Sequence, residues 1–228
     1  DTFRKLAKNS KKDADILQDL EDTLAMPSLE TSLMKWISRT PIMGSVYGSE
    51  NDSESVKKYV NEHLLAHKSM GEDAANRMSS YGTSDLEKMA QRFNAAHESA
   101  ISFLVPEGKI SRSRASLLFI ESYRELPLLA WPRKLIDAVV ELEESMVKWR
   151  HSHARMVERI MGRRIGTGGT SGVDYLDKTS QYRVFKDLWT AKEESERAKK
   201  TAEEADFLRA ATETELAKTR RDLDDANA

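Results

Sequence analysis

Cysteine is absent from the 228-residue sequence, and neither sign of charge is in clear excess. The lack of cysteine excludes disulfides and thiolate metal ligands, and it fits a reducing cytoplasm. The 36 Lys and Arg residues are balanced by 38 Asp and Glu residues, which gives a formal net charge of -2. This balance gives no electrostatic reason to expect nucleic-acid binding, because phosphate binding needs an excess of basic residues on one face.

Long apolar runs are missing as well. No stretch approaches the roughly 20 apolar residues that a membrane-spanning helix needs. The first twelve residues, DTFRKLAKNSKK, lack the apolar core of a signal peptide. They also lack a starting Met, so we expect a processed or trimmed end. We therefore expect a cytoplasmic protein without a membrane partner.

No segment makes a convincing strand, and helical spacing dominates instead. Pro27 ends a first helical pattern, and Ser28 is a candidate cap for a helix over 28–38. Pro41, Gly44 and Gly48 mark a loop. Further helices are expected over 53–70, 84–104, 111–127 and 132–162. The sequence predicts an all-α fold, a helical bundle.

The composition changes from Thr190 onward. The last 39 residues contain 8 Lys or Arg and 11 Asp or Glu, with many alanines and few large apolar side chains. Such a segment is typical of an exposed helix or a partly frayed coiled coil. We expect a domain over residues 1–189 and a charged helical extension over 190–228, which the core does not need.

The helix over 132–162 carries the clearest candidate for chemistry. Val139, Met146, His153 and Ile160 are spaced seven residues apart. This spacing predicts an apolar stripe that faces the interior, with His151 on nearly the opposite face. A buried neutral imidazole in such a stripe is a good axial ligand for haem iron. On spacing alone, a structural histidine that is hydrogen-bonded to a backbone carbonyl is the favoured interpretation.

A glycine-rich segment, GTGGTSG, follows at residues 166–172. Four glycines in seven residues allow a close approach of the backbone to an anion or a polar ligand. The segment is not a nucleotide-binding loop, because no Gly-Lys-Ser/Thr follows and it comes after a helix. A flexible linker between helices is the alternative.

Together these segments resemble the tryptophan 2,3-dioxygenase family. Residues 149–162 (WRHSHARMVERIMG) are similar to the family's W-R-x-x-H and M-V-x-R-x-x-G patterns, and 166–172 to its G-T-G-G-S-S-G pattern. The resemblance extends to 33–41 (LMKWISRTP), 111–120 (SRSRASLLFI), 123–127 (YRELP) and 182–188 (YRVFKDL).

The resemblance implies a haem-dependent oxygenase that inserts dioxygen into the indole ring of L-tryptophan or a close derivative. The product would be of the N-formylkynurenine type, in the kynurenine pathway of tryptophan catabolism. It also implies haem b as cofactor and a homotetramer in which neighbouring subunits complete each pocket. Trp36, Trp131 and Trp189 lie near helix ends, where aromatic residues often anchor interfaces, although they could equally pack within one subunit.

Residue by residue, His153 matches the proximal haem ligand. Thr167 matches the threonine that holds the ammonium group of the substrate, and Gly166, Gly168 and Gly169 let the loop close. Phe3-Arg-Lys-Leu is similar to the family's F-R-x-L, so Arg4 would pair with the substrate carboxylate. A solvated basic N-terminus is the alternative for Arg4.

The chain also departs from the family. The family's segment with the distal-pocket histidine lies upstream of the arginine and has no match here, so no catalytic residue is assigned. Thr170 stands where serine is usual, and the C-terminal helix is charged. Three alternatives stay open: a mono-oxygenase of secondary metabolism, a non-catalytic haem-binding helical protein, and a coiled-coil interaction module.

The other histidines carry weaker signals. His63 and His67 are four residues apart on a predicted helix and could share a metal ion, but the sequence offers no third ligand. We expect them to be a solvated pair. His97 has no evident partner.

Overall fold

The structure is a computed structural model that describes residues 11–78, 83–162 and 172–226. These ranges contain helices and no strand, which confirms the all-α prediction. None of the described helices is long and apolar enough to cross a membrane. The chain divides into two compact units, residues 1–36 and 37–228.

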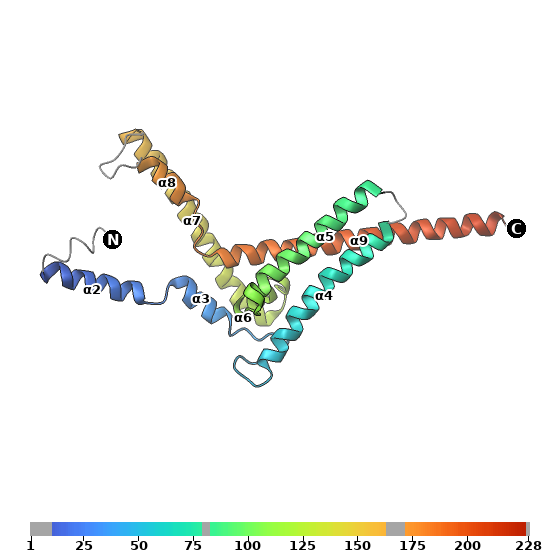
Figure 1. The fold of residues 1–228 in the computed structure, drawn as a ribbon, viewed down its shortest axis with the longest axis horizontal. Helices are drawn as coiled ribbons and strands as arrows, with labels where there is room; N and C mark the ends of the chain where they lie inside the picture. Colours follow the sequence, from blue (N-terminus) through green and yellow to red (C-terminus); the bar gives the residue numbers. More distant parts are fainter. Residues whose placement is uncertain (1–10, 79–82, 163–171, 227–228) are drawn as a thin grey trace. The chain divides into compact units, whose positions relative to one another are not determined.

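The first unit contains α2 (Lys11–Ala25) and most of α3 (Leu29–Ile37) (Figure 1). Ser28 caps α3 as predicted, because the Thr31 N–H donates to the Ser28 hydroxyl over 3.1 Å. Along α2, the apolar residues Ile16, Leu20 and Leu24 are exposed. The spacing of these three residues therefore predicted the helix correctly, but the apolar face that they form is exposed.

In the second unit, α4 (Asp52–Met78) and α5 (Thr83–Leu104) lie side by side as an antiparallel hairpin (Figure 1). We expected α4 to end near Met70, but it continues two turns further through Gly71. A Cβ atom at Gly71 would lie 3.1 Å from Cβ of Phe93 on α5. Glycine thus lets the two helices approach, and this packing supports a helix that its own propensity does not favour.

The core of the second unit surrounds α6 (Arg112–Ser122), whose residues 115–121 are all buried. Two short 3-10 turns, η1 (Pro106–Gly108) and η2 (Pro127–Leu129), flank it. After η2 come α7 (Ala130–Met161), α8 (Gly172–Ser180) and α9 (Lys186–Ala226). The largest fully buried apolar side chains include Leu104, Leu117, Leu118, Ile120, Leu129, Ile136 and Leu188.

Helix α9 corrects the expectation that residues 190–228 are exposed throughout. Its first half packs against α4, α5 and α6, and Ala191, Glu194, Ser195 and Thr201 are buried. Small side chains let neighbouring helices approach closely, so this contact does not need the large apolar residues on which the expectation rested.

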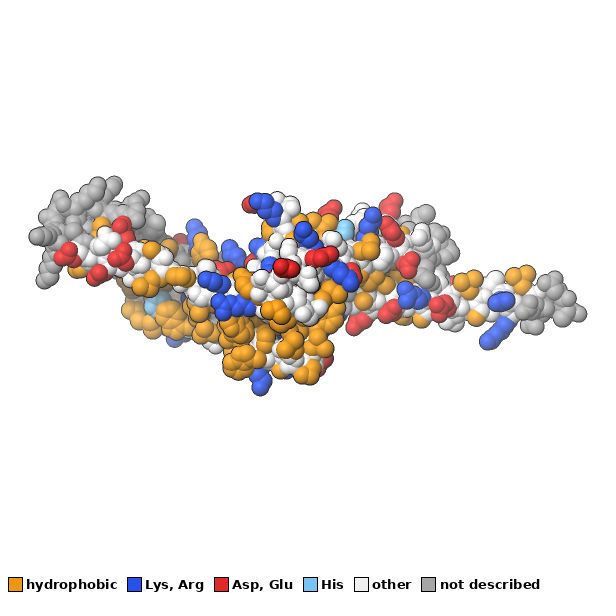
Figure 2. Space-filling view, turned by 90° about the horizontal axis from the view of Figure 1, so that it is seen from below, with side chains coloured by type: hydrophobic (Ala, Val, Ile, Leu, Met, Phe, Trp, Pro, Cys, Tyr) orange, Lys and Arg blue, Asp and Glu red, His pale blue; other side chains and the backbone are white. Residues whose placement is uncertain are grey.

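The second half of α9 matches the expectation of exposure. Phe207 is 73% exposed, and Leu216 and Leu223 are also exposed. Charged and hydrophobic side chains both lie on the surface of this end, at the right of Figure 2. The division between residues 189 and 190 into a ligand-binding domain and an extension stays a prediction.

Candidate functional site

His153 lies in the second half of α7, four turns after the buried segment at Ile136–Val140. Its side chain is half-buried, whereas His151 is exposed, so the two histidines differ as predicted. Neither ring nitrogen of His153 makes a hydrogen bond among the described residues. Among the described residues, His153 therefore does not donate to a backbone carbonyl, which was the structural alternative.

Trp149 holds the imidazole of His153 in one orientation. The two rings are stacked, with centroids 5.3 Å apart and planes inclined by 7°. The residues are four positions apart, so they are neighbours on the same face of α7. Trp149 itself is 65% exposed, which leaves the other face of its indole open to a ligand or a partner.

The apolar stripe around His153 does not face the interior of this chain as we expected. Val139 is buried, but Met146, Met156 and Ile160 are exposed, Ile160 by 76%. The buried residues of α7 lie mostly in its first half, and Ala154 is the buried residue of its second half, along which α8 lies (Figure 1). A helical stripe is buried only where another element covers it, and spacing alone does not supply that element.

Helix α8 is fastened to the second half of α7 by polar contacts. Arg155 on α7 forms ion pairs with Asp177 on α8 and with Glu158. Arg150 donates to the carbonyl of Tyr182 over 2.9 Å. Gly162 ends α7 with φ +65°, a conformation that favours glycine, as the predicted helix end requires. These contacts fix the two helices on either side of residues 163–171.

Glu143, which the sequence analysis did not single out, joins α7 to the beginning of α9. It is 1% exposed and accepts from the backbone N–H groups of Val184 and Phe185 and from the indole N–H of Trp189. A carboxylate satisfied by three donors is tolerated in a core. One feature of the sequence could have identified Glu143: it is an acidic residue four positions after Val139, on the apolar stripe of the helix.

The sequence profile of the family described as tryptophan 2,3-dioxygenase matches residues 3–194. The chain belongs to this family. Among tryptophan 2,3-dioxygenase relatives, tryptophan 2,3-dioxygenase 2 of Ralstonia nicotianae is 43% identical over 181 residues, covering 72% of this chain and 47% of that protein. A tryptophan 2,3-dioxygenase-like protein of Xanthomonas campestris pv. campestris is 43% identical, covering 73% of this chain and 64% of that protein.

A tryptophan 2,3-dioxygenase of Sorangium cellulosum is 42% identical, covering 73% of this chain and 42% of that protein. The chain thus spans between 42% and 64% of the length of these three relatives. The tryptophan 2,3-dioxygenase match includes α7 and α8 and ends within α9 at Glu194.

The predicted substrate residues of this tryptophan 2,3-dioxygenase family member lie outside the described residues. These are Arg4, Gly166, Thr167 and Gly168. His153 is therefore the one predicted site residue whose surroundings the structure describes. Its neighbours among the described residues are Trp149 and the exposed apolar side chains of α7.

His63, His67 and His97 lie away from this site, at the α4–α5 hairpin. We expected a solvated pair at positions 63 and 67, but His67 is only 2% exposed and His63 is half-buried. The reason is the packing of α5 and α9 over this face of α4. Among the residues described, no three His, Asp or Glu side chains are placed to hold a metal ion.

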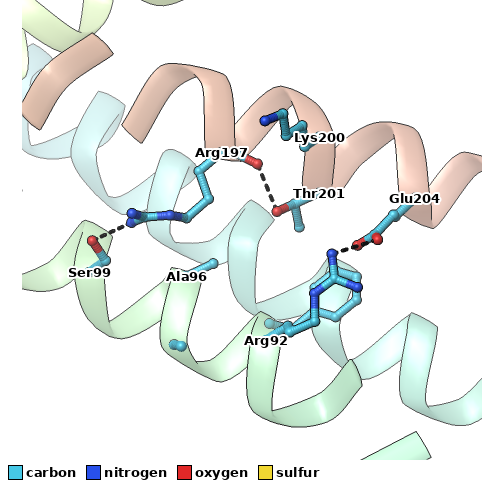
Figure 3. A pocket seen from close by; sticks show the side chains of 9 residues that line it. Arg92, Ala96, Ser99, Arg197, Lys200, Thr201 and Glu204 are labelled. Atoms are coloured by element: carbon cyan, nitrogen blue, oxygen red, sulfur yellow. Dashed lines mark hydrogen bonds and ion pairs between the residues drawn. The ribbon is translucent and has the colours of Figure 1, made fainter. Parts of the chain in front are cut away.

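A cleft of about 410 Å³ lies between α5 and α9 (Figure 3). Arg92 and Arg197 point into it from opposite sides. Arg92 pairs with Glu204 over 2.7 Å, and Arg197 pairs with Glu194 over 2.9 Å. Both guanidinium groups are thus neutralised by carboxylates of α9, and the cleft is not assigned a ligand.

Proposed function

We propose that this chain carries the haem- and substrate-binding part of a tryptophan 2,3-dioxygenase-type oxygenase that acts on L-tryptophan or a close derivative. Membership of the family supports the reaction class. The observation that carries the proposal is His153, an imidazole without a hydrogen-bond partner among the described residues, stacked on Trp149 within an exposed apolar surface. A porphyrin requires these two features of its proximal wall, a free imidazole nitrogen and apolar side chains.

The residues present fit a haem group, and the family is haem-dependent. Haem b is the cofactor that the resemblance to the family implies. His153 would ligate the iron, and Trp149 would hold the plane of the imidazole. Met146, Met156 and Ile160 would exclude water from the proximal face. Haem iron, when bound, supplies the activation of dioxygen.

The substrate side of the proposal rests on the family resemblance. The Thr167 hydroxyl accepts a hydrogen bond from the substrate ammonium, and Gly166 and Gly168 let the backbone approach it. Arg4 donates a bidentate pair of hydrogen bonds to the substrate carboxylate. Holding both charged groups at Cα of the amino acid orients the indole ring, which lowers the entropic part of the barrier.

The proposed product is of the N-formylkynurenine type, formed from L-tryptophan and dioxygen in the cytoplasm by a homotetramer. Residues 1–189 form the proposed ligand-binding domain, with 190–228 as its extension. The test is turnover by the full chain loaded with haem, reduced, and supplied with L-tryptophan and dioxygen. We expect one dioxygen consumed per N-formylkynurenine formed, read by absorbance and mass. An oxindole or a hydroxylated tryptophan as the product would overturn the proposal.

Thr167→Ala tests the substrate clamp separately. Loss of a hydrogen bond to a charged group should weaken L-tryptophan binding by about 1.5–3 kcal/mol, with haem content unchanged. Binding is measured as the change that L-tryptophan causes in the haem absorbance. Ser171→Ala is the matched control from the same segment. An unaltered tryptophan affinity in Thr167→Ala would contradict the clamp.

A further inference from the structure

Three histidines meet where α4, α5 and α9 pack together. Neither ring nitrogen of the buried His67 has a hydrogen-bond partner among the described residues. His63, one turn earlier on α4, has its ring centroid 4.8 Å from that of His67, and its Nε2 is also buried without a partner. His97 comes from α5, and its buried Nδ1 is likewise without a partner. Buried polar atoms are ordinarily paired, so this cluster calls for an explanation.

The charged groups that face His67 do not favour a second positive charge. His97 faces it from α5 and Arg197 from α9. Glu194 on α9 is the buried carboxylate that pairs with Arg197. Its Oε2 accepts from Ser99 over 2.8 Å and from Arg197 over 2.9 Å, whereas its Oε1 is buried without a partner among the described residues.

Among the described residues, neither ring nitrogen of His67 is joined by a hydrogen bond to a carboxylate of α4 or α6. Lys68 and Glu72 pair with each other, with 3.8 Å between the amine and the carboxylate. Tyr59 lies on the far side of His63, where its ring packs against Phe119 of α6. The neutral imidazole is therefore compatible with this packing, whereas the imidazolium is not.

Solvent reaches the cluster from one side. A cleft of about 350 Å³ between α4 and α5 is lined by His67 and His97 together with Gly71 and Phe93. Water in this cleft gives protons a path to the imidazoles without prior unfolding. The side chains that α9 buries here, such as Ala191, Ser195 and Thr201, are small. Small side chains therefore make much of the contact between this part of α9 and its neighbours.

We propose that His67 makes the docking of the α4–α5 hairpin onto α9 dependent on pH, so that the hairpin separates from α9 as the solution becomes acidic. This pH-dependent docking is independent of the proposed oxygenase function, because His67 lies outside the surroundings of His153. Acidification places a charge between His97 and Arg197, and separation of the helices lets water solvate it.

The direction follows from proton linkage. Burial, and then His97 and Arg197, lower the pKa of His67 from 6.5, and burial lowers the pKa of His63 to about 4. The separated state therefore binds protons first, and docking weakens as the pH falls below 6.5. Glu194 has the opposite effect on the pH dependence of docking. Burial raises the pKa of its carboxyl, so the docked state retains this proton more readily than the separated state. A variant at His67 isolates the histidine contribution from that of Glu194.

Hydrogen exchange of the full chain, followed by mass spectrometry between about pH 7 and about pH 5, tests the proposal. After correction for intrinsic exchange, the opening constant of α4, α5 and the first half of α9 should rise by up to about tenfold per pH unit, the effect of one linked proton. Protection of α7 should not change. The pH dependence should be weaker in His67→Phe, in which His63 and Glu194 still titrate, and unchanged in His151→Phe, which replaces an exposed histidine.

An unchanged pH dependence in His67→Phe would overturn the proposal, and so would parallel loss of protection in α7, which indicates global unfolding. If the phenyl ring does not fit, His67→Gln provides the same test with a neutral polar side chain. Retention of the wild-type pH dependence in a folded His67→Gln would be equally decisive against it.

Discussion

At the scale of single residues, Glu143 connects the two long helices of the second unit. Its carboxylate receives two backbone N–H groups just before α9 begins and the indole N–H of Trp189. The guanidinium of Arg183 lies 4.2 Å from the centre of the Trp189 ring, so this tryptophan is engaged within the subunit. Trp189 is therefore not one of the tryptophans available to anchor an interface between subunits.

Glu143→Ala should lower the free energy of unfolding by about 2–3 kcal/mol, because three donors lose their acceptor in a buried position. Chemical denaturation monitored by circular dichroism measures the change. Glu144→Ala, its exposed neighbour, is the matched control and should alter stability by less than about 0.5 kcal/mol. Equal effects of the two substitutions would show that the Glu143 contacts do not stabilise the fold.

The sequence predicted the position of His153 on α7 better than its environment. Seven-residue spacing correctly separates His153 from His151, because the face of a helix follows from its period alone. The burial of Met146 and Ile160 did not follow, because burial depends on which elements pack nearby. The stacking of Trp149 on His153 was not predicted either, because it depends on side-chain rotamers that spacing does not specify.

At the scale of elements, helix positions follow largely from proline, glycine and capping residues. Ser28 begins α3 and Gly162 ends α7 as predicted. The helix expected over 111–127 ends earlier, at Ser122. Two further errors, the end of α4 and the burial of the first half of α9, arise from contacts distant in sequence. Gly71 meets Phe93, and α9 meets three helices that precede it by up to about 130 residues. Local sequence signals do not encode such contacts.

Truncation of α9 should therefore depend on where the chain is cut. A chain ending at Ala205 should melt within about 4 °C of the intact chain, because the removed half buries little apolar area. A chain ending at Lys192 should melt more than about 10 °C lower, since it loses Glu194, Ser195 and Thr201 from their buried contacts. Calorimetry measures both, and equal melting temperatures for the two truncations would contradict the packing described.

At the scale of the whole molecule, exposed apolar side chains are concentrated on α7 and α8. Trp149, Met156, Ile160 and Tyr175 are all exposed there, and Trp131 at the start of α7 is 69% exposed. Exposed apolar side chains gathered on one pair of helices are typical of an interface or a ligand site. They support the proposed homotetramer, in which neighbouring subunits would cover part of α7.

Light scattering on the haem-loaded chain at micromolar concentration tests the assembly. The homotetramer predicts a mass close to four times the 25.9 kDa of one chain. Trp131→Ser should shift the mass toward smaller species without a loss of helix content, because it removes an exposed side chain. A mass near 25.9 kDa for the unaltered protein would contradict the proposed tetramer.

The central claim is that His153 binds haem iron, and haem titration of the full chain tests it most directly. The intact chain should develop a sharp Soret band at a stoichiometry of one haem per chain. His153→Ala should lose this band, whereas His151→Ala, altered two residues away on the exposed side of the same helix, should retain it. Equal haem binding by the two variants, both folded by circular dichroism, would contradict the assignment of the site.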